Sequence, residues 1–130
     1  MGESSTQGRL RPPGARRHVG LTLPRRVKQD VLAAAEVIGW SAGDWVLAAA
    51  AEHGPRLVEA VGRRELPRRA RVEDATFTAL YLTDDERDEI DEQASGCGLN
   101  RSAFVTAVAQ LALGHHLADV TAELAPGDPV

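Results

Sequence analysis

Aromatic residues are scarce in this chain of 130 residues: they make up 4% of it, so Ala, Val and Leu must fill most of any core. The single cysteine excludes a disulfide within the chain and a cysteine-based metal cluster. No His-Glu-x-x-His or Cys/His spacing suggests zinc, and neither a phosphate loop nor a dinucleotide fingerprint occurs. The longest alanine-rich run, 46–51, is far too short to span a membrane. We therefore expect no cofactor, no metal, no membrane partner and no enzymatic activity.

Charge is strongly segregated along the chain, although the net charge is only −4. Residues 1–28 carry +6 and residues 55–71 carry +4, whereas residues 29–54 carry −4 and residues 72–130 carry −10. Such segregation says more about partners than the total does, and it favours a polyanion as the partner of the basic segments. The alternative interpretation is a solvated tail followed by a solvated linker.

The chain repeats itself at an offset of 59 residues, with no gap. Residues 21–23, Leu-Thr-Leu, recur as residues 80–82, Leu-Tyr-Leu, and Gly39 recurs as Gly98. The other matches join Val31 with Ile90, Ala35 with Ala94, Trp40 with Leu99, Trp45 with Phe104 and Val46 with Val105. Two copies are too few for a solenoid, but they suit two units that share one core about a pseudo-two-fold axis.

Each copy has the pattern of a strand followed by two helices. In the first copy, residues 18–23 alternate between apolar and polar as a half-buried strand does. Residues 24–38 have apolar residues at helical spacing, and Gly39 ends that helix. A second helix is expected over 41–53, because Gly54-Pro55 interrupts the pattern. The expected buried stripe of the first helix is Val27, Val31, Leu32, Ala35 and Ile38.

In the second copy, residues 76–82 are rich in β-formers. Thr83 and Glu86 have the spacing of a capping box at the start of an acidic helix. Asn100 is expected to cap the last helix, which runs to about Leu117. Cys97 falls on the apolar stripe of the acidic helix, so it is expected to be a small buried hydrophobe.

A lone strand leaves its backbone groups without partners, so we expect the two strands to pair. The predicted fold class is mainly α with a two-stranded antiparallel β-ribbon, in which two units share one core. The expected division is a disordered basic arm over 1–16, a first unit over 17–53, a linker over 54–75 that includes a short helix near 56–62, a second unit over 76–117 and a frayed C-terminal tail over 118–130.

Both copies resemble the ribbon-helix-helix DNA-binding domain. In the first copy the resemblance rests on residues 19–24 and on Gly39-Trp40-Ser41, and in the second on residues 80–86 and 98–104. The chain is similar to the tandem, single-chain members of that family, whereas most members pair two identical chains. The resemblance implies a ribbon in the major groove, with its outward side chains at base edges and the N-terminus of each second helix at a phosphate.

The resemblance carries specific roles onto this sequence. It implies base contacts from the outward residues of both strands, which are His18, Gly20, Thr22, Phe77, Ala79 and Tyr81. It implies contacts to the DNA backbone from Arg16, Arg17, Ser41, Asn100, Arg101 and Ser102. The basic arm, with Arg9 and Arg11, is expected to follow the backbone or to reach a minor groove.

The predicted base contacts depart from the polar residues that the family mostly uses. Gly20 and Ala79 stand at the centre of the ribbon, with Phe77 and Tyr81 beside them, and none of these makes the bidentate contacts that discriminate bases strongly. One interpretation is that small central residues let the ribbon sit deep, so that the polar outward residues donate and accept hydrogen bonds while apolar atoms contact thymine methyls.

Two other interpretations stay open. A slip of one residue would turn the second strand over, so that Thr76 and Thr78 face DNA and the two aromatic residues pack inside. Alternatively, the ribbon face binds a protein, and DNA binding has been lost.

These observations together predict a sequence-specific double-stranded DNA-binding protein. The expected setting is the cytoplasm of a bacterium, on nucleoid or plasmid, as a transcriptional regulator or as an accessory factor in plasmid transfer. Further copies of the chain are expected to bind side by side on DNA. The acidic helix over 84–92 must face away from phosphate, and it is a candidate docking surface for a protein partner. The alternative function is a protein-interaction module, either antitoxin-like or part of a partition complex.

Overall fold

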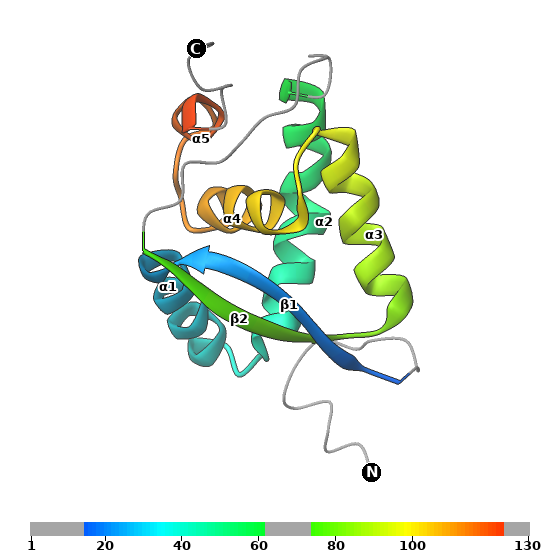
Figure 1. Ribbon diagram of the computed structural model, residues 1–130. Helices are drawn as coiled ribbons and strands as arrows, with labels where there is room; N and C mark the ends of the chain where they lie inside the picture. Colours follow the sequence, from blue (N-terminus) through cyan, green and yellow to red (C-terminus); the bar gives the residue numbers. More distant parts are fainter. Residues whose placement is uncertain (1–14, 62–73, 124–130) are drawn as a thin grey trace.

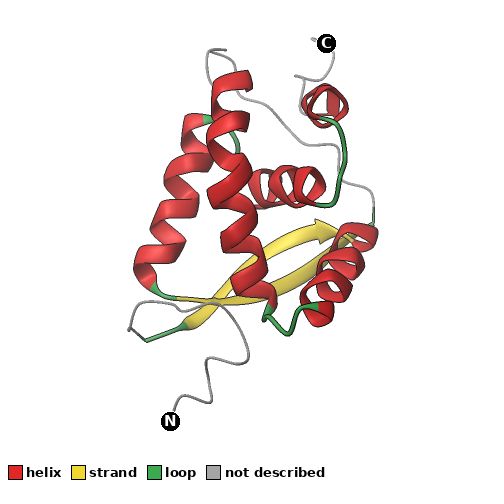
Figure 2. Cartoon of the chain, turned by 180° about the vertical axis from the view of Figure 1, so that it is seen from behind, coloured by secondary structure: helices red, strands yellow, loops and turns green. Residues whose placement is uncertain are grey.

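The computed structural model describes residues 15–61 and 74–123, which form a mainly helical fold with one two-stranded antiparallel sheet. The sheet, hereafter the ribbon, consists of β1 (Arg17–Pro24) and β2 (Ala75–Leu82), and its register places Gly20 opposite Ala79. The helices are α1 (Arg25–Val37), α2 (Ala42–Val61), α3 (Asp84–Gly96), α4 (Arg101–Ala112) and α5 (Leu117–Glu123). Helices α2, α3 and α4 stand on one side of the ribbon (Figures 1 and 2). These findings confirm the predicted mainly helical fold with a two-stranded antiparallel ribbon, while its division into two equivalent units stays a prediction.

The elements recur at the offset of the sequence repeat. Helices α1 and α3 both start and end 59 residues apart, and α2 and α4 also start 59 residues apart. The turns between the helices match as well, since Gly39 and Gly98 have positive φ angles of 75° and 70°. Glycine occupies these positions because other residues adopt this conformation only with strain.

Side chains cap three of the helices, and two of these caps, at Thr83 and Asn100, are the ones predicted above. The capping box of Thr83 and Glu86 is confirmed at the start of α3. The Asn100 and Ser41 side chains each accept the amide N–H three residues farther on, at 2.8 and 3.1 Å. These caps satisfy amides that would otherwise have no partner within the helix, and they fix where each helix begins.

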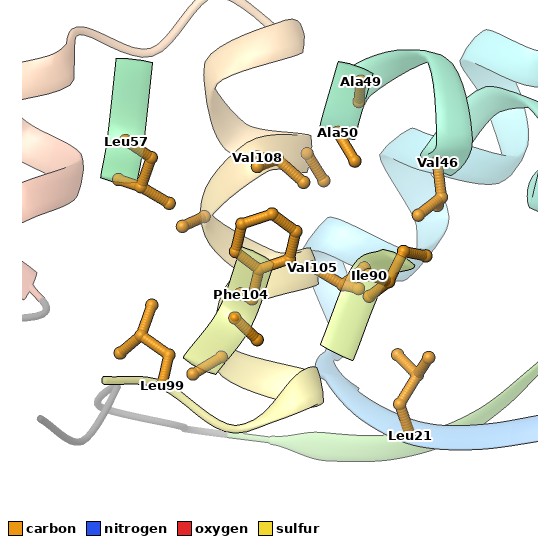
Figure 3. Packing of buried hydrophobic residues seen from close by; sticks show 14 of the residues in the cluster. Leu21, Val46, Ala49, Ala50, Leu57, Ile90, Leu99, Phe104, Val105 and Val108 are labelled. Carbon is orange, nitrogen blue, oxygen red and sulfur yellow. The ribbon is translucent and has the colours of Figure 1, made fainter. Parts of the chain in front are cut away.

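The hydrophobic core lies between the inner face of the ribbon and the helices. Both strands alternate as expected, and the inward side chains of Val19, Leu21, Leu23, Leu80 and Leu82 are buried. Phe104 of α4 is fully buried among side chains of α2, α3 and α4 (Figure 3). Cys97 is buried in the same cluster, which confirms its prediction as a small core residue.

Helix α2 does not end near His53, as Gly54-Pro55 suggested, but continues to Val61. Proline inside a helix removes a backbone hydrogen bond and costs about 3 kcal/mol. Leu57 and Val61, beyond the proline, are buried, and full burial of such side chains contributes about 1.5–3 kcal/mol each. Core packing therefore outweighs the local signal, and the described start of the expected linker is helical.

Helix α4 ends at Ala112, earlier than the predicted end near Leu117. Gly114 follows with a φ of 103°, and α5 then begins at Leu117. The tail was expected to be frayed from residue 118, but α5 extends through it to Glu123 and buries Val120. The burial of this apolar side chain stabilises a segment that is too short for its length alone to predict a helix.

The buried stripe of α1 is narrower than predicted. Val27, Val31 and Ala35 are buried, whereas Leu32 and Ile38 are exposed. Ile38 follows the last helical residue, where it serves as the C-cap, so it leaves the face that the helical spacing assigned to it.

Some expectations fall outside the described residues. These are the basic arm up to residue 14, with Arg9 and Arg11, residues 62–73 of the linker and residues 124–130 of the tail. The division into arm, units, linker and tail therefore stays a prediction. Within residues 15–61 and 74–123, no single helix is long and apolar enough to cross a membrane; α1 and α2 meet that criterion only together, as a pair bent by 100°.

Candidate nucleic-acid interface

The outer face of the ribbon, hereafter the ribbon face, carries all of the residues predicted to contact bases. They form three cross-strand pairs, His18 with Tyr81, Gly20 with Ala79 and Thr22 with Phe77. Every one of them is exposed, Phe77 at 66% and Tyr81 at 54%. The ribbon face therefore has a small apolar centre between two pairs that each contain an aromatic ring. Contact with bases itself stays a prediction.

The interpretation in which the second strand is turned over is wrong. Thr78 is only 6% exposed and lies opposite Leu21, while both aromatic residues of β2 point outward. The slip would have placed Leu80 and Leu82 in water, and a ribbon with one buried face resists such a change of register. Thr78 is therefore not available as a base contact, and Thr76, which is half-buried, lies on the same inward side of β2.

Aromatic side chains cover much of the ribbon face. The His18 and Tyr81 rings lie 4.2 Å apart between centroids, with their planes tilted by 33°. The Phe77 ring lies over Gly20, since a Cβ on that glycine would be 3.0 Å from the ring. Glycine at the centre of β1 thus leaves the space that the neighbouring aromatic ring fills.

The N-termini of α2 and α4 lie against the two strands of the ribbon. Ser102, in the first turn of α4, accepts the N–H of Thr22 on its Oγ at 2.9 Å. Gly43, its equivalent in α2, comes so close to β2 that a Cβ would lie 2.9 Å from the Tyr81 carbonyl oxygen. Helix N-termini carry a partial positive charge, so each border of the ribbon face has one helix end of that sign, although Asp44 lies in the first turn of α2.

Two cationic side chains reach the same strands. The Lys28 ammonium donates to the Phe77 carbonyl of β2 at 3.0 Å, and the Arg101 guanidinium donates to the Gly20 carbonyl of β1 at 3.3 Å. Sequence reasoning missed Lys28 as a member of the site, although it belongs to the basic segment. It missed Gly43 too, although the repeat aligns this residue with Ser102.

The residues predicted to contact the DNA backbone divide into two groups. Arg16 precedes β1 and Arg17 is its first residue; both are exposed, and Arg17 lies 4.0 Å from Asp84. The other four residues, Ser41, Asn100, Arg101 and Ser102, belong to the starts of α2 and α4. Ser41 and Asn100 use their side-chain oxygens as caps, so an anion at either helix end would meet the first backbone amides rather than these side chains.

Arg101 is held by a carboxylate that the sequence did not single out. Its Nε and Nη2 donate to the two carboxylate oxygens of Asp91 at 2.9 and 2.8 Å. These bonds hold the pKa of the Asp91 carboxyl below its ordinary value and raise the pKa of Arg101. The pair joins α3 to α4, and no periodicity in the sequence points to it.

The pair of Asp91 and Arg101 is expected to make the stability of the fold depend on pH. Since the folded-state pKa of Asp91 is lowered, the pair stabilises the fold above about pH 4, and its contribution is lost as the pH falls through the folded-state pKa. Asp91→Asn is expected to lower the free energy of unfolding by about 0.5–1 kcal/mol at neutral pH, because the pair is partly exposed. The difference from wild type should disappear in acid, as measured by urea denaturation.

Glu92→Gln provides the matched control for that experiment. Glu92 is exposed on the same helix, and no ion pair joins it to another of the described residues. It should change stability little at either pH. Equal effects of the two substitutions at neutral pH would contradict the role given to Asp91.

The described residues contain no group of three or more His, Cys, Asp or Glu side chains that could hold a metal ion. Hydrogen-bond donors beside the ribbon face include helix amides, the Lys28 ammonium and the Arg101 guanidinium. Two carboxylates lie among them: Asp91 pairs with Arg101, and Asp44 is buried in the first turn of α2. The free amides at the helix ends suit an anion. Comparisons of the chain with protein-family models, with curated proteins and with solved structures find no match.

Proposed function

We propose that this chain is a sequence-specific double-stranded DNA-binding protein of the tandem ribbon-helix-helix type. The observation that carries the proposal is the pair of helix N-termini beside the two strands of one exposed antiparallel ribbon. A two-stranded ribbon fits the major groove, where outward side chains meet base edges. The helix ends would then meet the phosphates that border the groove.

The register of the ribbon supports the tandem arrangement. Gly20 pairs with Ala79, which is also its equivalent at the offset of 59 residues. A two-fold axis through this pair would exchange β1 with β2, α1 with α3 and the start of α2 with the start of α4. In this proposal, one polypeptide builds what a symmetric dimer builds from two chains.

The two proposed halves carry different charges. Arg25 and Arg26 begin α1, whereas their equivalents in α3 are Asp84 and Asp85. The two ends of the ribbon therefore differ, and the DNA site has no need to be a palindrome. The acidic side of α3 would face away from phosphate. A bacterial regulator or a plasmid-transfer accessory factor would use the same binding chemistry, with further copies side by side on DNA.

A salt titration tests this proposal. The affinity for a short random-sequence duplex, followed by fluorescence anisotropy, is expected to fall linearly with salt on logarithmic axes. Contacts from two helix ends and a few flanking cations predict a slope of about −2 to −4. Absence of binding even at low salt would contradict DNA binding.

Substitutions locate the binding surface. Arg101→Ala is expected to weaken binding to all duplexes about equally and to reduce the salt slope by about 1. The double change of Arg17→Ala and Thr22→Ala is expected to weaken binding to a selected DNA site more than binding to a random duplex. Arg87→Ala, which removes an arginine from the acidic α3, is the control and should have little effect. If neither of the first two variants changes affinity, the ribbon is not the binding surface.

A second function, a protein-interaction module, is favoured by one observation. The ribbon face exposes two aromatic rings and contains no Arg, Lys, Asn or Gln. Aromatic residues are enriched in protein interfaces. Under this function, the ribbon face would bind another protein, as in an antitoxin-like protein or a partition complex. The chain would then bind no duplex at low salt.

A further inference from the structure

We infer that the ribbon face recognises the 5-methyl groups of pyrimidines in the major groove. It would therefore prefer sites that carry thymine or 5-methylcytosine under the apolar part of the ribbon face. This inference rests on the proposed binding to duplex DNA, and it adds the chemical group that is recognised.

The composition of the ribbon face restricts how it can distinguish base pairs. Bidentate recognition of guanine or adenine needs Arg, Lys, Asn or Gln, and acceptance from cytosine needs Asp or Glu. None of these residues lies among the three outward pairs. Other direct contacts in this groove are hydrogen bonds from Ser or Thr, which fit several bases, and contact of an apolar side chain with the methyl group of thymine, for which Ala, Phe and the methyl of Thr are the usual partners. The ribbon face has one of each, in Ala79, Phe77 and Thr22.

These apolar groups form one surface. Phe77 lies opposite Thr22, and its ring also extends over Gly20, which pairs with Ala79. The Thr22 hydroxyl is directed towards α4, where it lies 3.5 Å from Ser102 Oγ. The methyl group of Thr22 therefore occupies another of the positions on Cβ and not the one that faces Ser102. Since Phe77 is largely exposed, a methyl group placed against its ring would remove apolar area from water.

The charges around this surface favour DNA as its partner. Neither strand of the ribbon contains an acidic residue. Lys28 reaches β2, Arg101 reaches β1 while it is paired with Asp91, and a helix N-terminus lies beside each strand. An apolar strip between two helix N-termini complements a groove with phosphates at both sides. In unmodified DNA, the thymine methyl is the apolar group displayed on the floor of that groove.

The spacing limits the extent of this recognition. Successive outward residues of a strand lie about 6.7 Å apart, which corresponds to roughly two base steps. The apolar pairs, Gly20 with Ala79 and Thr22 with Phe77, would therefore cover a few base pairs towards one end of the ribbon. The His18–Tyr81 pair lies at the other end, where an imidazole and a phenol can form hydrogen bonds. The preferred site is thus rich in methyl groups on one side and polar on the other.

Two pairs of duplexes test the inference at one low salt concentration. Affinity is measured for an alternating A·T duplex and for the same duplex with deoxyuridine in place of thymidine. It is also measured for an alternating G·C duplex with and without 5-methylcytosine. We expect uracil to weaken binding by about fourfold for each methyl group that the ribbon face would otherwise bury, and 5-methylcytosine to strengthen it by a similar factor.

Substitutions connect the effect to the ribbon face. Phe77→Ala is expected to reduce both affinity ratios towards one, and Ala79→Ser is expected to lower them independently. Val37→Ala removes another exposed apolar side chain, 84% exposed at the end of α1, and should leave both ratios unchanged. All three positions are exposed, so thermal melting of each variant should match that of wild type.

The possible failures are distinguishable. Salt-dependent binding with equal affinity for methylated and unmethylated duplexes would overturn methyl recognition and leave DNA binding intact. Unchanged ratios in both ribbon variants would overturn the assignment to this surface. If no duplex binds at low salt, the proposed function and this inference fail together.

Discussion

Replacing Phe104 with Ala is expected to lower the free energy of unfolding by about 3–5 kcal/mol. Phe104 is fully buried, and it contacts the core at the point where α2, α3 and α4 meet (Figure 3). Its removal reduces the buried apolar area and leaves a cavity that the surrounding helices can only partly fill. Because small proteins are stable by about 5–15 kcal/mol, this single change should remove a large part of the total. Urea denaturation, followed by circular dichroism, measures the loss.

Phe77→Ala is the matched control, since it makes the same chemical change on the ribbon face. Phe77 is mainly exposed, so its loss should change stability by no more than about 0.5 kcal/mol. The two variants separate the roles of the two phenylalanines in the described chain, one in the core and one on the surface. Similar destabilisation by both would show that the core does not lie where Phe104 places it.

Local signals account for the parts of the fold that the sequence predicted. The alternation around Leu21 and Leu80 has a period of two, and that period alone decides which side chains face the core. The caps at Thr83 and Asn100 act within one helical turn, so a short stretch of sequence identifies them. The composition of the ribbon face was predictable for the same reason.

Features that depend on distant residues were not predictable in this way. The continuation of α2 past Pro55 depends on a core built from other helices, and so does the burial of Val120 in α5. In the candidate site, Asp91 of α3 accepts hydrogen bonds from Arg101 of α4. Lys28 donates to the Phe77 carbonyl, which lies 49 residues farther along the chain. Sequence patterns show which side chains share a face but not which elements approach each other.

Gly43→Ala tests the close approach of α2 to the ribbon. This substitution is expected to destabilise the fold by about 1–3 kcal/mol. The new Cβ would lie 2.9 Å from the Tyr81 carbonyl oxygen, which is a backbone atom. Relief of that contact requires the helix or the strand to move, so the start of α2 would shift away from the border of the ribbon face. Urea denaturation measures the stability, and the duplex titration measures the effect of the shift on affinity.

Two other glycines in helices serve as controls for the effect of replacing glycine itself. At Gly96 the new Cβ would lie 3.6 Å from Val58, an ordinary contact, so Gly96→Ala should stabilise the fold by up to about 1 kcal/mol through helix propensity. At Gly54 it would meet the end of the flexible Gln93 side chain at 2.7 Å, so Gly54→Ala should fall between the other two variants. If helix propensity alone decided the outcome, all three variants would gain stability. A stable Gly43→Ala would mean that α2 does not touch the ribbon, and its N-terminus would then be too far from the ribbon face to hold a phosphate beside it.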